Sequence, residues 1–213
     1  MVLNPQDATL AAYERGARQY AERTAAALSP EVGVLLARVP AGAHVLELGS
    51  GPGRDAAALE AAGLTVDRTD GARAFVESQR AAGHEARVLD VRAGDFGGPY
   101  DAVFANAVLL HVPRADLPGV LVTARRACRA GGVLVASFKK GSGEAWTQVK
   151  LDDPRHFTYW DERGLEGALT AAGWTPEQVT ESTLPESAEL WITAIARNEA
   201  SVPASTGAQA RSR

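Results

Sequence analysis

Residues 45–55 read VLELGSGPGRD and decide the fold, because a short apolar strand runs directly into a glycine-rich turn and then into a helical pattern. Gly49, Gly51 and Gly53 stand at alternate positions, so one edge of the turn carries no Cβ atoms. Backbone N–H groups and the start of the following helix can therefore approach a ligand closely. The stretch predicts a nucleotide-type ligand site on an α/β sheet.

The glycine spacing and one acid indicate which ligand this is. A dinucleotide fingerprint has the spacing G-x-G-x-x-G, whereas here the third glycine comes one position earlier and Arg54 stands in its place. Glu47 is a carboxylate within the apolar strand. It would repel a pyrophosphate and attract the cationic amino and sulfonium groups of S-adenosylmethionine. The alternative is a structural glycine turn in which Glu47 forms a salt bridge.

The pattern E-x-G-x-G-x-G closely resembles motif I of the class I S-adenosylmethionine-dependent methyltransferases, and the resemblance covers roughly residues 13–196. It implies an enzyme with S-adenosylmethionine as its cofactor. The cofactor-binding residues that it implies in this stretch are Glu47, Gly49, Ser50, Gly51, Gly53 and Arg54.

Strand and helix patterns alternate after residue 42, which predicts a parallel sheet with crossover helices. The predicted strands are 43–48, 64–69, 86–89, 100–105 and 132–138, followed by 175–181 and 190–197. The predicted helices are 54–62, 72–82, 114–130 and 161–171. We expect an α/β fold: a Rossmann-like, doubly wound, seven-stranded and mostly parallel sheet. The resemblance implies that its last strand is antiparallel.

Length and composition favour a single domain over residues 1–198, with a disordered tail over 199–213. The 213 residues carry a net charge of −4 and no basic stripe, which argues against a nucleic-acid partner. A single cysteine, Cys128, and four scattered histidines give no metal-ligand spacing. With no signal sequence and no apolar run of membrane-spanning length, we expect a cytoplasmic, bacterial-type enzyme, monomeric or homodimeric, without a membrane partner.

The N-terminal segment 9–28 predicts one helix that places Tyr13 and Tyr20 on the same face. The resemblance implies that this helix caps the cofactor. Tyr20 is then a cofactor contact and Tyr13 a substrate contact. Packing of both tyrosines in the core is the alternative.

Acids near the ends of the second and third predicted strands are candidate cofactor ligands. Asp70, followed by Gly71, stands 17 residues after Gly53, where one carboxylate can accept from both ribose hydroxyls. A helix N-cap role is the alternative, and Asp67 is interpreted as a solvated strand residue. The resemblance places Asp90 against the adenine amine and Val91 beside the ring, although Asp90 could equally begin a turn.

The segment 101–113, DAVFANAVLLHVP, resembles motif IV and the segment that follows it in the family. The resemblance implies that the backbone around Ala105 and Asn106 faces the methionine part and the methyl group. His111 is the candidate catalytic base, because imidazole accepts a proton near neutral pH. The alternative is that His111 only ties down its loop by hydrogen bonding.

The irregular region 139–160 is expected to form a lid-like insertion bordering the acceptor pocket. It begins with KKGSGEAW and ends with RHFTYW, and its basic and aromatic residues suit a small anionic or aromatic ligand. The candidate substrate residues are Lys139, Trp146 and Tyr159, with Tyr13 and His111. Solvated lysines and rings that cover a sheet edge are the alternative.

These inferences predict methyl transfer to a small-molecule acceptor by in-line displacement, for which the protein mainly aligns the reactants and excludes water. Two alternatives stay open at this point. One is a protein that binds S-adenosylmethionine without transfer activity. The other is an NAD-type oxidoreductase, which the glycine spacing and Glu47 argue against.

Overall fold

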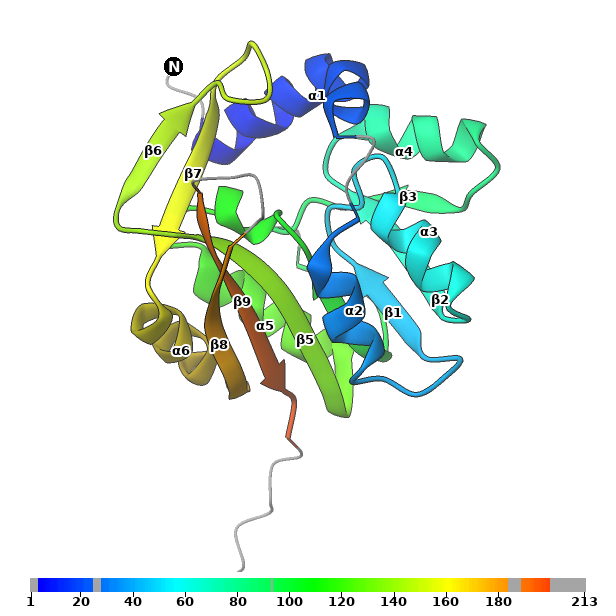
Figure 1. Cartoon of the computed structure of the whole chain (residues 1–213), viewed down its shortest axis with the longest axis vertical. Helices are drawn as coiled ribbons and strands as arrows, with labels where there is room; N and C mark the ends of the chain where they lie inside the picture. The colour runs from blue at the N-terminus through cyan, green and yellow to red at the C-terminus, as the bar shows by residue number, and fades with distance from the viewer. Residues whose placement is uncertain (1–3, 25–27, 93, 184–188, 200–213) are drawn as a thin grey trace, which may run out of the picture.

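The structure is a computed structural model that describes residues 4–24, 28–92, 94–183 and 189–199. A twisted mixed sheet runs through the molecule, with helices on both of its faces (Figure 1). The predicted tail, 199–213, lies outside the described residues except for its first residue. In the described part of the chain, no helix is both long and apolar enough to cross a membrane.

Five parallel strands form the first half of the sheet, in the order β3-β2-β1-β4-β5. Their bounds are β1 His44–Glu47, β2 Thr65–Asp70, β3 Ala86–Val88, β4 Tyr100–Ala105 and β5 Cys128–Lys140. All five lie within two residues of their predicted positions except β5, which begins four residues earlier. The order reverses between β1 and β4, which is the point where doubly wound sheets bind ligands.

The second half of the sheet confirms the predicted antiparallel last strand. Strand β9 (Leu190–Arg197) pairs antiparallel with both β5 and β8 (Thr175–Thr183). The path β3-β2-β1-β4-β5-β9-β8 therefore contains the seven predicted strands. Two further strands, β6 (Glu144–Thr147) and β7 (Arg155–Trp160), form an antiparallel hairpin, and β7 continues the sheet beside the end of β5. They lie within the region predicted as an irregular insertion.

The two faces of the sheet are buried by different helices. Helix α2 (Pro30–Leu36) and helix α3 (Arg54–Ala61) cover one face, where Val45, Phe104 and Val135 point. Helix α5 (Leu117–Ala127) and helix α6 (Glu162–Ala171) cover the other face, where Leu46 and Val103 point. Neighbouring residues of β1 and β4 alternate between the two cores because successive strand side chains point to opposite faces.

Helix α1 (Pro5–Arg23) lies across the carboxyl edge of the sheet, between α4 (Arg73–Ala81) and β7 (Figure 1). It begins four residues before the predicted start, because the Asn4 side chain caps it by accepting from the backbone N–H of Gln6 at 2.9 Å. Its predicted continuation to residue 28 is wrong, since the helix ends at Arg23. The sequence analysis also missed α2, although Ser29 and Pro30 form a common helix start.

Candidate functional site

A cavity opens at the carboxyl ends of β1 to β4, beneath helix α1. The residues that line it are Gln6, Thr9, Leu10, Tyr13, Tyr20, Glu47, Gly49, Ser50, Gly51, Pro52, Arg54, Asp55, Asp70, Gly71, Phe75, Leu89, Asp90, Val91, Asn106, Ala107, Val108 and His111. The chain thus brings most of the predicted cofactor residues to one cavity.

Gly51 leaves one wall of the cavity open. Its φ is +52°, a value that favours glycine, and a Cβ atom added there would meet no atom within 4 Å. Its N–H donates to Asp70 Oδ2 at 2.8 Å, and its carbonyl accepts from the Gln79 side chain at 2.9 Å. The turn is therefore fixed on both sides while its surface stays free for a ligand.

Gly53 was predicted in the site, but the structure places it outside the cavity. It is the N-cap residue of α3 with a φ of +83°. A Cβ atom there would lie 2.8 Å from Arg68 Nη1 and 2.9 Å from Gln79 Oε1. The third glycine therefore serves close packing beneath the turn.

Glu47 ends β1 and lines the cavity with only 3% of its surface exposed. Its Oε2 atom is buried and accepts no hydrogen bond from any described residue. Burial raises the pKa of this carboxyl group to about 8. A cation in the cavity would compensate the buried charge, so this is a site for a positively charged ligand group.

Asp70, at the end of β2, has both carboxylate oxygens in defined positions. Oδ2 accepts from the Gly51 N–H and Oδ1 from the Ala72 N–H at 2.7 Å. Burial raises the pKa of Asp70 to about 6, while these two hydrogen bonds oppose the shift. Asp70 is not the N-cap of α4, because Ala72 occupies that position. Gly71 lies under α1, where a Cβ atom would meet Leu10 Cδ2 at 2.6 Å.

Asp67, which was interpreted as a solvated strand residue, forms an ion pair and a hydrogen bond away from the cavity. Its carboxylate pairs with Arg87 at 2.9 Å and accepts from the Tyr100 hydroxyl at 2.5 Å. It does not line the cavity. Of the two acids in this strand, Asp70 is the one at the site.

Asp90 and Val91 line the cavity after β3. Asp90 also forms the turn that was the alternative interpretation, because its Oδ1 accepts from the Arg92 N–H at 2.9 Å. Burial acts to raise the pKa of Asp90, but bonding to Arg92 holds it below its ordinary value. The two interpretations are therefore compatible.

After β4, Asn106 lines the cavity, whereas Ala105 is buried inside the strand and does not. The Asn106 amide donates to Asp55 at 3.0 Å and accepts from the Ser137 hydroxyl at 2.6 Å. Arg54, at the start of α3, lines the cavity and donates to the Thr24 carbonyl.

A second, smaller cavity adjoins the first. The two share Tyr13, Tyr20, Ala107 and His111, which form the junction between them. The other residues of the second cavity are Leu110, Lys139, Val149, Lys150, Arg155, Phe157, Glu189 and Trp191. The predicted substrate residues Tyr13, His111 and Lys139 therefore lie at this smaller cavity.

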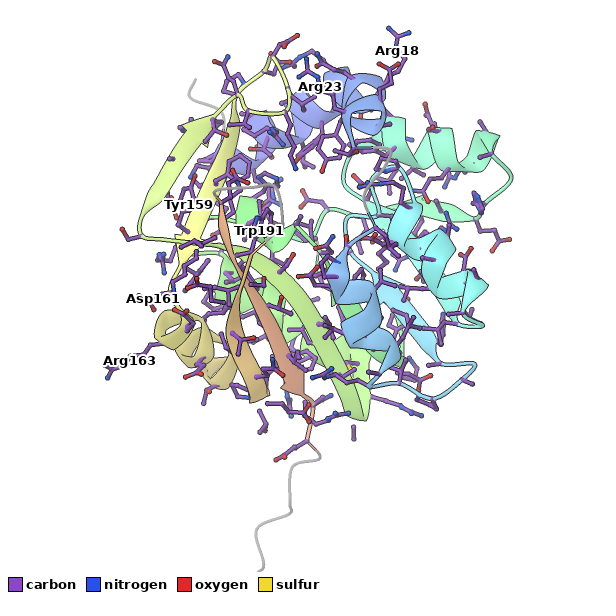
Figure 2. The ribbon with its side chains drawn as sticks, in the orientation of Figure 1. Arg18, Arg23, Tyr159, Asp161, Arg163 and Trp191 are labelled. Carbon is purple, nitrogen blue, oxygen red and sulfur yellow. The ribbon has the colours of Figure 1, made fainter. Side chains whose placement is uncertain are left out.

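Trp146 and Tyr159, the other predicted substrate residues, line neither cavity. Trp146 is 48% exposed on β6 and packs edge-on against His156. Tyr159 lies on β7, beside the end of β5, whereas Trp191 at the start of β9 lines the second cavity (Figure 2). Alternation along β7 puts Arg155, Phe157 and Tyr159 on the same side of the strand, and of these Arg155 and Phe157 line the second cavity.

His111 has hydrogen-bond partners at both ring nitrogens. Nδ1 lies 2.6 Å from the His156 carbonyl oxygen, so Nδ1 must carry the proton and donate it. Nε2 is then free to accept from the Tyr13 hydroxyl at 2.8 Å. Burial, with the nearby charges of Arg155 and Lys139, lowers the pKa of His111 to about 3. The ring is a neutral acceptor that fixes the Tyr13 hydroxyl.

Nine lining residues were missing from the sequence prediction: Gln6, Thr9, Leu10, Pro52, Asp55, Phe75, Leu89, Ala107 and Val108. Leu10 shares the predicted face of Tyr13 and Tyr20, so the helix pattern could have identified it. Phe75 packs against both tyrosines, and no sequence signal distinguished it from a core residue. Across the described ranges, no group of three or more His, Cys, Asp or Glu side chains could hold a metal ion.

Comparison with known proteins identifies related folds. The family described as "Methyltransferase domain" matches residues 19–179. The comparison with curated proteins found no significant match. Three solved structures illustrate the similarity in fold.

The 1,6-didemethyltoxoflavin-N1-methyltransferase of Burkholderia thailandensis, with bound 1,6-didemethyltoxoflavin and S-adenosylhomocysteine, has a TM-score of 0.73 and 21% identity, covering 94% of this chain and 92% of that one. A TehB-like SAM-dependent methyltransferase from Corynebacterium glutamicum has a TM-score of 0.68 and 20% identity, covering 88% and 98%. Phosphoethanolamine N-methyltransferase 2 of Haemonchus contortus, in complex with S-adenosyl-L-methionine, has a TM-score of 0.71 and 14% identity, covering 93% and 61%.

Proposed function

The chain belongs to the class I S-adenosylmethionine-dependent methyltransferases, and from that premise we propose that it methylates a small-molecule acceptor by in-line displacement. The observation that carries the proposal is Glu47, a buried carboxylate with an unpartnered oxygen beside an open glycine turn. It fits a cationic ligand and disfavours a pyrophosphate. The same geometry makes an NAD-type oxidoreductase the poorer account of the site.

The residues of the larger cavity fit the parts of S-adenosylmethionine. Asp70 would accept from the ribose hydroxyls, because its carboxylate is fixed by two backbone N–H groups and still has free lone pairs. Asp90 and Val91 would hold the adenine. The turn at Gly49, Ser50 and Gly51 would border the methionine part, with Glu47 near its cationic groups. Tyr20, Arg54 and Asn106 complete this end of the cavity.

The junction of the two cavities is the proposed place of methyl transfer. When bound, S-adenosylmethionine supplies an activated methyl group, whose carbon–sulfur bond breaks as the bond to the acceptor forms. The chain contributes alignment and exclusion of water, for which the buried residues around Tyr13 and His111 are suited. The second cavity adjoins this junction and is the proposed place of the small-molecule acceptor.

His111 is proposed to act as a positioning residue. A general base needs a pKa near the working pH, whereas burial holds the His111 pKa near 3. Its hydrogen bond fixes the Tyr13 hydroxyl at the junction, and its Nδ1–H ties the helical turn η1 (Leu109–His111) to β7. The Tyr13 hydroxyl is thus the polar group presented to an acceptor there.

The test begins with isothermal titration of the purified chain with S-adenosylhomocysteine, with NAD as the control ligand. Micromolar binding of S-adenosylhomocysteine alone supports the cofactor assignment. A screen of small acceptors with methyl-labelled S-adenosylmethionine then separates an enzyme from a protein that only binds the cofactor. Binding of NAD without S-adenosylhomocysteine would contradict the proposal.

The remaining parts of the sequence reading stay predictions. They are a single domain over 1–198 with a lid-like region at 139–160, a cytoplasmic location, and a monomeric or homodimeric state. Lid movement would be supported if altering the 148–153 loop, which contacts α1 through the Arg15–Asp153 ion pair at 2.8 Å, changed turnover without changing cofactor affinity.

A further inference from the structure

We infer that the acceptor carries an anionic group, of the carboxylate or phosphate type, and that Arg155 binds this group in the second cavity. The inference rests on the proposed function and specifies the chemical class of its acceptor.

Arg155 is a buried cation without an acidic partner among the described residues. The residue is 2% exposed, and the one side-chain hydrogen bond that it donates to another described residue runs from Nη1 to the Tyr13 hydroxyl at 2.8 Å. None of the ion pairs within 4.0 Å in the described ranges involves Arg155, and its Nε atom is buried without a hydrogen-bond acceptor. Leaving a buried charge unpaired is costly, so an anion supplied from outside the chain is the natural partner.

Arg68 is as buried as Arg155 but has a structural role. It is also 2% exposed, but its guanidinium pairs with Glu60 at 2.6 Å and donates to Gln79 at 3.1 Å. Arg68 lines neither cavity, whereas Arg155 lines the second one. The unpaired guanidinium is therefore found where a ligand can reach it.

The position of the Arg155 guanidinium suits an anionic group. Its guanidinium carbon lies 5.2 Å from the ring centres of both Tyr13 and Phe157, which hold it in place. Nη1 is used by Tyr13, and Nε is buried without a hydrogen-bond acceptor. Nη2 donates to no other described residue, so it is the nitrogen that can donate a charge-assisted hydrogen bond to a carboxylate or phosphate oxygen.

The charges around the cavity favour an anion as well. Lys139 and Glu189 form an ion pair at 2.5 Å and largely neutralise one another. Lys150 adds a further cation, and no described acid is ion-paired with it. The described residues that line this cavity include three cations (Lys139, Lys150 and Arg155) and one acid (Glu189), although the whole chain carries a net charge of −4. Phe157 and Trp191 provide apolar surface for a small planar body.

The experiment compares isosteric probes on protein saturated with S-adenosylhomocysteine. Benzoate and phenyl phosphate are the anionic probes, benzamide is the neutral isostere of benzoate, and each is titrated by calorimetry. We expect benzoate or phenyl phosphate to bind about tenfold more tightly than benzamide or better, because hydrogen bonds to a charged group are the stronger ones. Whichever of the two anions binds more tightly identifies the anionic group of the acceptor molecule as a carboxylate or a phosphate.

Arg155→Gln tests whether Arg155 binds the anionic group. It should abolish the preference for the anion while S-adenosylhomocysteine affinity stays within about twofold of the wild type, because Arg155 lies outside the larger cavity. Arg155→Lys keeps the charge without the guanidinium and should show an intermediate preference. Arg163→Gln is the matched control, since Arg163 is exposed on α6 and projects away from the sheet (Figure 2).

Three results would overturn the inference: equal binding of benzoate, phenyl phosphate and benzamide, no binding of either anion, or an unchanged preference in folded Arg155→Gln. The comparison of probes on wild-type protein decides the matter even if that variant does not fold. Failure of the wild-type chain to bind S-adenosylhomocysteine would instead contradict the proposed function, so the two failures are distinguishable.

Discussion

The backbone N–H of Gly51 donates to a carboxylate oxygen of Asp70 at 2.8 Å, across 19 positions of the chain. This bond joins the glycine turn after β1 to the end of β2. Ser50 strengthens the junction, because its N–H donates to the Thr69 carbonyl at 2.7 Å. The ligand-facing groups of two strands are therefore fixed relative to one another by the fold itself, which lowers the ordering cost of binding.

Asp70→Asn should weaken S-adenosylhomocysteine binding by roughly 10- to 100-fold, because a charge-assisted hydrogen bond to a ligand is worth about 1.5–3 kcal/mol. Calorimetric titration measures the effect. Asp67→Asn is the matched control on the same strand, since Asp67 is bound to Arg87 and Tyr100 away from the cavity. It should lower stability while leaving affinity unchanged. Equal affinity losses in both variants would contradict the assignment of Asp70.

Gly51→Ala should reduce cofactor affinity much more than it reduces stability. An added Cβ atom meets nothing within 4 Å, so the folding cost is the left-handed backbone alone, about 1 kcal/mol. Gly63→Ala is the matched control, with a φ of +89° and equally open surroundings but no place in the cavity. The unfolding temperature should fall by a similar amount in both variants. If the affinity for the cofactor also falls by a similar amount in both, the open face of the turn does not contact the ligand.

The fold was largely predictable because its signals are local. The central strands β1, β4 and β5 contain apolar runs, and the helices between the first strands end at glycines such as Gly63 and Gly83. The errors arose where pairing between distant residues decides the structure. Cys128 lies in a helical pattern, but it begins β5 because it pairs with Tyr100 of β4.

The site was predictable where a motif carried it and not where tertiary packing did. Glu47, Gly51 and Asp70 follow from strand ends, which a parallel sheet brings to one edge. Arg155 follows from the position of β7 beside β5, a pairing that involves only Lys139 and Lys140 and left no periodic signal. No sequence pattern indicates that Arg155 lacks an acidic partner among the residues that the structure describes.

Glu47→Gln should stabilise the cofactor-free protein while weakening binding of S-adenosylmethionine. The Glu47 pKa is about 8 in the folded state, above its ordinary value of 4.5. The folded wild type therefore binds more protons than the unfolded chain between these values, and its stability falls as pH rises from about 4.5 to 8. Glu47→Gln does not lose stability in this way. Its free energy of unfolding, measured in urea, should therefore exceed that of the wild type by a few kcal/mol at pH 8.

The same shift predicts proton release on binding. At pH 7 the free Glu47 is mostly protonated, and a cationic ligand group favours its ionised form. Titration of S-adenosylmethionine in two buffers of different ionisation enthalpy should report about one proton released by the wild type and none from this site in Glu47→Gln. Equal release from both proteins would show that Glu47 does not face the cation.

His111→Gln should flatten the acid side of the stability profile. The folded His111 pKa is about 3, below the ordinary 6.5, because the ring is buried near Arg155 and Lys139. The unfolded chain therefore takes up the proton first, and the wild type loses stability as pH falls below about 6.5. Between pH 7 and pH 5 it should lose about 2 kcal/mol relative to the variant, measured by urea unfolding at each pH. A parallel decline of both proteins would mean that His111 protonates freely in the folded state. It would then return as a candidate base, because its ring would no longer be held as the neutral acceptor of the Tyr13 hydroxyl.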